Sequence, residues 1–422
     1  MIYLDNAATT PVRPEALEAM LPYFDTKFGN ASTVYALGHE SREALKGSRE
    51  KVASVLHAKA SEVYFTSGGS ESDNWALKSV FELRRADFAH PHIITSVIEH
   101  HAVLNTCRWL ESQGAEVTYL PVDAEGFVDP DEVEKNIRPE TVLISVMMAN
   151  NEIGTIQPIR EIGEIAHRHH ILFHTDSVQA FGQIPIDVQS MDIDLLSASS
   201  HKLGGPKGVG MLYIRDGISL PSLIHGGSQE SGRRAGTENI PGIVGFAAAA
   251  QRALEHMDEQ MQREAFLRDC MIREIRGTIP GCTLNGPDPL QAESEKPGSE
   301  GSGPEGTGSE KNGSEGTGSE RSGFDWLGFQ GKRLPGNVNF SFDGIESEEL
   351  LVLLDKDGVC ASSGSACSAG SVQPSHVLKA IGKSDAQAHS AVRFSIGILN
   401  TEDEIRTAVE LLREDIEKLR AF

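Results

Sequence analysis

Short runs of β-branched and aromatic residues alternate with amphipathic stretches between residues 60 and 215. Strands that alternate with helices favour right-handed crossovers, which join parallel strands and cover both faces of a sheet. The alternation therefore predicts an α/β fold with a mostly parallel sheet, in which ligands gather at the carboxyl ends of the strands. The expected strands lie at 63–66, 92–95, 117–120, 142–148, 171–174 and 194–197, and helices are expected at 101–113 and 159–170.

The chain is 422 residues long, which exceeds what one ordinary hydrophobic core supports. A helix-like stretch rich in Ala, Glu, Gln and Leu spans 243–276, and shorter segments follow it. We therefore expect an N-terminal arm and large domain over 1–260 and a smaller α+β C-terminal domain over 261–422. The later segments are predicted as a strand at 333–342 and helices at 347–357 and 402–419.

Residues 291–323 differ in kind from the rest of the chain. They consist mainly of Gly, Ser and Glu, with seven Glu against three Lys or Arg, and Glu-Gly-Thr-Gly-Ser-Glu occurs at 305 and again at 315. Such a composition cannot bury enough apolar surface to offset the entropy of ordering. We expect a disordered insert that takes no part in catalysis.

Charge and cysteine content limit the partners and the compartment. Asp and Glu outnumber Lys and Arg by 61 to 38, a net charge of −23, which argues against nucleic acid or an anionic membrane as partner. The five cysteines are scattered without a C-x-x-C pair, so neither a disulfide framework nor a zinc knuckle is indicated. With no export signal and no apolar run near the roughly 20 residues of a membrane span, we expect a cytoplasmic protein.

A glycine-rich turn after the last strand run contains a lysine suited to covalent catalysis. Ser200-His-Lys202 follows small hydroxyl residues and leads into Gly-Gly-Pro. An amine that forms a Schiff base needs a pocket mouth, partial desolvation and small neighbours that leave room for a ring. Lys202 is therefore predicted to hold pyridoxal 5′-phosphate, and the alternative is a surface lysine in a Gly-Pro turn.

An anion cup is predicted where Phe65-Thr-Ser-Gly-Gly-Ser-Glu-Ser-Asp-Asn74 joins a strand end to a helix start. Ser70 and Asp73 in this segment are spaced as a capping pair. Free backbone N–H groups and the helix dipole at such a junction attract a phosphate. The alternative is a plain N-cap turn.

Two polar segments also follow strand runs. Asp176, in His174-Thr-Asp176, offers a carboxylate that can pair with a protonated pyridine nitrogen, although it could instead cap the next helix. His100, in Glu99-His-His-Ala102, offers a ring that can stack on a planar cofactor and pass protons, whereas His101 is expected to face solvent. No metal site is predicted from the histidines at 167, 169, 170 and 174, because they fall within one helix end and one strand.

Further motifs occur in order along the chain. They are Tyr3-Leu-Asp-Asn-Ala-Ala-Thr-Thr-Pro11, Phe28-Gly-Asn-Ala-Ser32, Ala149-Asn-Asn-Glu-Ile-Gly154, Arg234-Ala-Gly-Thr237, Ser362-Ser-Gly-Ser-Ala-Cys367 and Ser390-Ala-Val-Arg-Phe-Ser395. With the motifs around Asp176 and Lys202, this series resembles a fold-type I pyridoxal-phosphate enzyme of the class V aminotransferase superfamily. It is most similar to the cysteine desulfurases of the NifS and IscS type, and the resemblance is interrupted only by the insert.

The resemblance implies a role for each matching residue. Lys202 would be the Schiff-base lysine, Asp176 the partner of the pyridinium nitrogen, and His100 a catalytic ring stacked on the cofactor. Asn151 and Arg393 would bind the substrate carboxylate, which suits the planar fork of an arginine. A phosphate site completed by a second subunit implies a homodimer. The remaining cofactor ligands would be Gly69, Ser70, Asn151, Gln179 at the ring hydroxyl, Ser199, His201 and, from the second subunit, Thr237.

Cys367 lies in a run of small residues without an apolar anchor, 362–370. We expect a mobile loop that brings a thiolate to the substrate sulfur, whereas Cys360 is expected to pack in a strand. The form of the motif resembles the long-loop subgroup of the family, in which Cys367 could also serve as a transient iron–sulfur ligand.

The implied reaction converts L-cysteine to L-alanine and leaves sulfur as a persulfide on Cys367. An iron–sulfur scaffold or a thiolation protein would then accept the sulfur. Three alternatives remain from the sequence. A class V aminotransferase would need a keto acid and no Cys367, a selenocysteine lyase would use the same pocket, and a non-catalytic scaffold that binds sulfur carriers need not keep Lys202.

Overall fold

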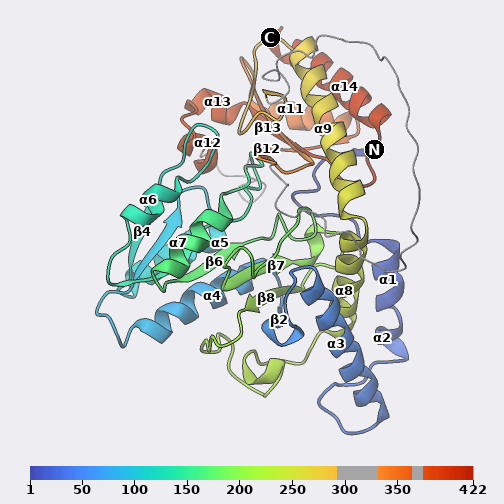
Figure 1. Cartoon of the computed structure of the whole chain (residues 1–422). Coiled ribbons are helices and arrows are strands. Elements are labelled where there is room, and N and C mark those ends of the chain that lie inside the picture. The colour runs from blue at the N-terminus through green and yellow to red at the C-terminus, as the bar shows by residue number, and fades with distance from the viewer. Residues whose placement is uncertain (292–330, 364–373, 422) are drawn as a thin grey trace, which may run out of the picture.

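The computed structural model describes residues 1–291, 331–363 and 374–421 (Figure 1). The predicted Cys367 loop and nearly all of the predicted insert therefore lie outside the described residues. In the described residues no helix combines the length and the apolar character that crossing a lipid bilayer requires.

The largest sheet has seven strands in the order β2-β8-β7-β6-β5-β3-β4. Neighbours from β7 to β4 pair in parallel, whereas β8 is antiparallel to both of its neighbours. The predicted α/β fold with a mostly parallel sheet is thus confirmed. The strands are β2 (Val63–Thr66), β3 (His92–Ser96), β4 (Glu116–Leu120), β5 (Thr141–Ser145), β6 (Leu172–Asp176), β7 (Leu195–Ser199) and β8 (Gly210–Ile214).

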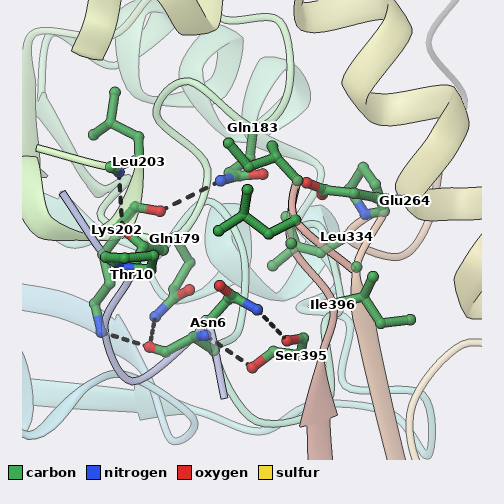
Figure 2. Close-up of a pocket in the computed structure, with 18 of the residues that line it drawn as sticks. Asn6, Thr10, Gln179, Gln183, Lys202, Leu203, Glu264, Leu334, Ser395 and Ile396 are labelled. Carbon is green, nitrogen blue, oxygen red and sulfur yellow. Dashed lines mark hydrogen bonds between the residues drawn. The ribbon is translucent and has the colours of Figure 1, made fainter. Parts of the chain in front are cut away.

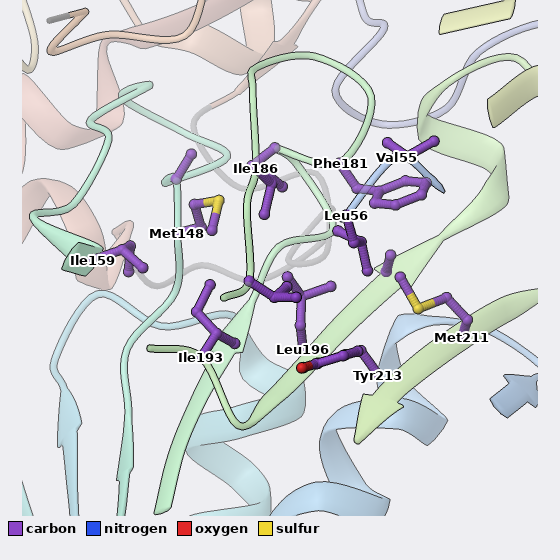
Figure 3. Close-up of a cluster of buried hydrophobic side chains, with 14 of the residues drawn as sticks. Val55, Leu56, Met148, Ile159, Phe181, Ile186, Ile193, Leu196, Met211 and Tyr213 are labelled. Carbon is purple, nitrogen blue, oxygen red and sulfur yellow. The ribbon is translucent and has the colours of Figure 1, made fainter. Parts of the chain in front are cut away.

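Helices cover both faces of this sheet, so its strands are buried on both sides. Because successive strand residues point to opposite faces, Leu195 joins a cluster with Trp75 of α4, while Leu196 joins a cluster with Phe246 of α8. Figure 3 shows part of the second cluster around Leu196 and Phe181. The flanking helices are α3 (Ala36–Ser54), α4 (Gly69–Arg84), α5 (His101–Ser112), α6 (Pro130–Lys135), α7 (Ile159–Arg168) and α8 (Ile240–Glu255).

A smaller antiparallel sheet, in the order β12-β13-β10-β9, forms the C-terminal part of the fold. Its strands are β9 (Cys282–Leu284), β10 (Asn337–Phe342), β12 (Ser362–Ser363) and β13 (Ala391–Ser395). It shares a hydrophobic core with the helices beside it. These helices are α9 (Met257–Thr278), α11 (Ser347–Lys356) and α14 (Glu402–Arg420), and α12 (His376–Ala380) and α13 (Asp385–His389) complete this part.

The N-terminus packs with the C-terminal part of the chain. Strand β1 (Ile2–Tyr3) pairs in parallel with β11 (Val359–Cys360), and Leu4 is buried in the core of the smaller sheet. The strand predicted for Cys360 is confirmed. The chain then crosses to the large sheet through α1 (Pro14–Met20) and α2 (Pro22–Asp25).

Three predicted elements differ in the structure. The strand predicted over 142–148 spans Thr141–Ser145 instead. The single helix-like stretch at 243–276 is divided between α8 and α9, because His256 leaves helical geometry with φ −123° and ψ 16°. The strand predicted from residue 333 begins only at Asn337. Proline lacks the N–H that a strand ladder needs, and Pro335 precedes this start.

Candidate active site

A pocket of about 380 Å³ lies at the carboxyl ends of β3, β5, β6 and β7, as expected for a parallel sheet. Every predicted site residue in the described part of the chain lines it, with the exception of Thr237. The structure thus brings together Gly69, Ser70, His100, Asn151, Asp176, Gln179, Ser199, His201, Lys202 and Arg393.

The turn predicted as an anion cup lies at the start of α4, but its cap differs from the prediction. Gly68, with φ +153°, is the N-cap residue, and no side chain caps this helix, so Ser70 and Asp73 are not a capping pair. A Cβ at Gly69 would come within 2.5 Å of the Val178 side chain, so the turn needs glycine to pack this closely. Glu71 accepts from the backbone N–H of Ser67 at 2.8 Å and thereby holds the turn.

Asp73 instead lines the pocket with Asp176, and both carboxyl groups are buried. Burial raises the pKa of both, while the charges of His100 and Lys202 oppose the shift at Asp176. His174 lies beside them as a neutral ring, because burial lowers its pKa to about 3. Asp176 also accepts from the backbone N–H of Val178 at 2.9 Å, which fixes its carboxylate. A buried carboxylate held in this way can stabilise a cationic ring nitrogen.

The amine of Lys202 is directed at the N-terminal segment. It donates to the carbonyl oxygen of Ala7 at 2.5 Å, and Gln179 also donates to Ala7 O, at 3.0 Å (Figure 2). Lys202 donates as well to the carbonyl oxygen of Ala8 at 2.8 Å. In this structure the Gln179 amide therefore binds the main chain, although a ring hydroxyl was predicted as its partner. Ala7 and Ala8 line the pocket but received no predicted role, although they lie in the motif that begins at Tyr3.

His201 is fixed by the same N-terminal segment. Its Nδ1 lies 3.1 Å from the hydroxyl of Thr9, and its carbonyl accepts from the Thr10 N–H at 2.9 Å. Burial, with added repulsion from Lys202, lowers the pKa of His201 to about 4. The ring is therefore neutral at pH 7 and can donate a hydrogen bond from one nitrogen only.

Arg393 lies on β13, is 1% exposed and lines the pocket. Its Nη2 donates to Asp5 at 2.8 Å, and its Nη1 donates to the backbone carbonyl of Asn151 at 3.1 Å. Its Nε is buried without a hydrogen-bond partner among the described residues. A buried donor of this kind favours an incoming acceptor such as a carboxylate.

The two histidines after β3 have different surroundings. His100 caps α5, with its Nδ1 accepting from the Ala102 N–H at 3.1 Å, and it lines the pocket. His101 was expected to face solvent, but it is half-buried, with its ring centroid 4.9 Å from that of His376. The helix after the Cys367 segment covers it, which the local sequence could not indicate.

Thr237 does not line this pocket and is exposed in the segment that precedes α8, whereas Cys367 lies outside the described residues. Ser362, close before the Cys367 segment, donates to Asp5 at 3.0 Å. Asp5 therefore connects the strand that leads toward Cys367 with the guanidinium of Arg393.

These residues fit a pyridoxal phosphate group. The pocket combines a lysine amine, a buried carboxylate, an imidazole and a helix N-terminus, where Gly69 presents no side chain to an incoming phosphate. Fold and site together define an α/β enzyme of the pyridoxal-phosphate-dependent class.

The family model for aminotransferase class-V matches residues 2–296 and 319–407, and the chain belongs to this family. It is 48% identical over 419 residues to the cysteine desulfurase IscS of Methanosarcina thermophila, covering 99% of this chain and 93% of that one. It is 46% identical over 422 residues to the cysteine desulfurase IscS of Dictyoglomus turgidum, covering 100% and 96%. The resemblance seen in the sequence motifs is confirmed.

Solved structures agree with these relatives. A NifS-like protein superposes with a TM-score of 0.83 at 34% identity, covering 99% of both chains. A structure described as SspA in complex with cysteine gives a TM-score of 0.75 at 37% identity, covering 94% of this chain and 99% of that one.

Proposed function

We propose that this protein is a pyridoxal-phosphate-dependent cysteine desulfurase, which converts L-cysteine to L-alanine and leaves the sulfur on Cys367. The observation that carries the proposal is the meeting of Lys202, Asp176 and Arg393 in one pocket. The names of the relatives point to the same activity. A lysine, a carboxylate and an arginine supply the three contacts that an α-amino acid and this cofactor need.

When bound, the cofactor withdraws electrons from the amino acid and makes its Cα proton acidic. Asp176 would keep the ring nitrogen protonated, and Arg393 would bind the substrate carboxylate together with Asn151. Lys202 would move the Cα proton, and His100 would pass protons near the substrate sulfur. The other predicted cofactor ligands, Gly69, Ser70, Gln179, Ser199 and His201, line the same pocket.

In the net step the substrate C–S bond breaks and a bond forms between that sulfur and the Cys367 sulfur. L-Cysteine and a thiol give L-alanine and a persulfide, so the step needs no external oxidant or reductant. A carrier such as an iron–sulfur scaffold or a thiolation protein would then take the sulfur from Cys367. We also propose that this exchange occurs in the cytoplasm.

The proposed enzyme is a homodimer in which Thr237 reaches the phosphate site of the second subunit. An exposed apolar surface supports this assembly, since large patches of this kind mark interfaces. Thr237 is itself exposed and lies outside its own pocket. The apolar surface comes from one stretch between α1 and α3, with Leu17, Leu21, Phe24, Phe28, Val34 and Tyr35 each 48% exposed or more.

The division into a cofactor domain over 1–260 and a catalytic-cysteine domain over 261–422 also remains a proposal. It predicts that the cofactor is held mainly by the first part and that the second part supplies Arg393 and Cys367.

The decisive experiment measures L-alanine and sulfide after the purified holoenzyme is mixed with L-cysteine. Lys202→Ala should lose the covalently held cofactor, while Cys367→Ser should keep it and form no alanine. Cys360→Ser is the matched control and should remain active, because Cys360 lies on β11 and does not line the pocket. A requirement for a keto acid would indicate an aminotransferase, and no alanine from the holoenzyme would refute the proposal. Selenocysteine as the preferred substrate would indicate a lyase.

A further inference from the structure

A second pocket adjoins the catalytic one and is not used by the proposed reaction. It has a volume of about 300 Å³, which lies at the lower end of the range for small-molecule sites. The two pockets share only Ala7, Asn151, Gln179 and Lys202. The second pocket extends from there toward α9 and the loop after β13, and its walls include Leu203, Leu334, Ile396, Ile398 and Leu399.

Glu264 supplies an unusual polar group to these walls. It is 3% exposed, and it makes no hydrogen bond or ion pair with any residue that the structure describes. Burial raises the pKa of Glu264 to about 8, against a lowering by Arg13 and Arg263. At neutral pH the side chain is therefore a carboxylic acid, which offers one donor beside one acceptor. Figure 2 shows it reaching into the pocket from α9.

The charges around Glu264 argue against an ionic ligand. Arg13 would repel a cation, and each of its three nitrogens already has an acceptor within the protein. Its Nε binds Leu203 O at 3.0 Å, and Gln260 can accept from Nη2 and Nη1 at 3.1 and 3.2 Å. An anion would thus lose its hydration against apolar walls without gaining an arginine fork. The other charged or titratable groups nearby are Glu15, Lys202, Arg252, His256, Glu259 and Arg263.

Two side-chain amides provide further acceptors. Gln183 donates to Lys202 O at 3.4 Å, and Asn6 donates to Ser395 O at 2.8 Å. The amide oxygen of each remains as an acceptor at the pocket wall. A ligand that pairs with a protonated carboxyl and also offers a second N–H therefore matches the wall. A primary amide has this pattern, because its carbonyl accepts while its two N–H groups donate.

We propose that this pocket binds a small neutral molecule in which an apolar ring or chain carries a primary amide, paired with Glu264 through two hydrogen bonds. The ligand would contact Gln183 and Ala7, which also contact Lys202. Binding should therefore shift the absorbance of the cofactor, and this one consequence rests on the proposed function.

Benzamide, benzoate and benzylamine are matched probes, because they share one ring and differ in the polar group. Ligand-observed NMR and calorimetry on the holoenzyme at pH 7 should detect benzamide and show binding of the other two to be at least about tenfold weaker. Between pH 7 and pH 9.5 the affinity for benzamide should fall by about tenfold, because ionised Glu264 loses its donor.

Three variants isolate the role of Glu264. Glu264→Gln keeps a donor beside an acceptor, so binding should persist and become independent of pH. Glu264→Met keeps the volume but removes both groups, so affinity should fall by at least about tenfold. Glu259→Gln, on the same helix and 81% exposed, should behave like the parent. Unchanged cofactor content in each variant verifies the fold.

Equal binding of benzylamine or benzoate would overturn the proposal, and so would undiminished binding of benzamide to Glu264→Met. Competition between benzamide and L-cysteine would place the probe in the catalytic pocket and would also refute it. These experiments measure binding and do not depend on alanine formation. A negative result would therefore refute the amide site without refuting the desulfurase activity, which is tested separately.

Discussion

Arg393 Nη2 lies 2.8 Å from Asp5 Oδ1, so a buried guanidinium on β13 is paired with a carboxylate of the N-terminal segment. The second oxygen of Asp5 accepts from Ser362 at 3.0 Å. The residue proposed to bind the substrate carboxylate is thus held by a residue nearly 390 positions away in the sequence. Pairing between β1 and β11 makes this contact possible.

Asp5→Asn should raise the KM for L-cysteine by roughly tenfold with little change in kcat, because a charge-assisted hydrogen bond that orients Arg393 is replaced by a neutral one. Steady-state alanine formation measures both constants. Affinity for cysteamine, which lacks the carboxylate, should not change, and Asp25→Asn on α2 serves as an exposed control. Tighter binding of L-cysteine by Asp5→Asn would instead show that Asp5 competes with the substrate.

Asp176→Asn should keep the cofactor on Lys202 but slow alanine formation by roughly 100-fold, the loss seen when one preorganised electrostatic contact is removed. The amide still accepts from the Val178 N–H but cannot balance a protonated ring nitrogen. Borohydride trapping measures the bound cofactor, and turnover measures the rate. A rate near that of the parent would remove Asp176 from the proposed mechanism.

The strand pattern allowed part of this pocket to be predicted, because parallel strands present their carboxyl ends along one edge of a sheet. Asp176 ends such a strand, and His100 and Lys202 each follow one, so residues distant in sequence were expected to meet. Other predicted residues came only from the resemblance to the family, and they are Asn151, Gln179, Ser199, His201 and Arg393. The roles of Ala7 and Asp5 could not be predicted. They depend on the pairing of β1 with β11, for which a two-residue strand gives no periodic signal.

The burial of single charged residues could not be predicted from the sequence either. Glu264 belongs to a long amphipathic helix in which glutamates normally face water, and tertiary packing around α9, with Gly336 beside its carboxyl group, buries it. The break at His256 between α8 and α9 escaped prediction for a related reason. Every residue around it favours or tolerates a helix, so tertiary packing decides where the helix ends.

The buried carboxyl group of Glu99 should make the free energy of unfolding depend on pH. It is fully buried, and burial raises its pKa to about 8 although the Ser96 hydroxyl and the Met147 N–H bind it. The folded state thus keeps a proton on Glu99 that the unfolded chain releases near pH 4.5. The stability that this bound proton contributes is therefore fully present below pH 4.5 and is lost as the pH rises to about 8. Glu99→Gln stays neutral and can accept the same two hydrogen bonds.

Glu99→Gln should therefore gain stability relative to the parent between pH 5 and pH 8, by at least about 1.4 kcal/mol, the free energy of one pKa unit. Denaturant unfolding of the holoenzyme at both pH values measures the difference. Glu161→Gln, at an exposed position in the first turn of α7, should show no such trend. If the free energies of unfolding of the parent and of Glu99→Gln differ by the same amount at both pH values, Glu99 is already ionised in the folded protein.

Deleting residues 291–323 should leave alanine formation from cysteine within about twofold of the parent, because a low-complexity segment contributes no packed core. The residues that flank this segment are fixed by hydrogen bonds that do not involve it. Arg333 is buried and donates to the carbonyls of Asn285, Pro287 and Asn337 at 2.9 Å. Arg333→Met is the contrasting variant, and it should lower the unfolding free energy by about 3 kcal/mol, since it leaves three buried carbonyls unpaired. A large loss of alanine formation in the deletion, with cofactor content and unfolding unchanged, would show instead that the segment helps to close the active site.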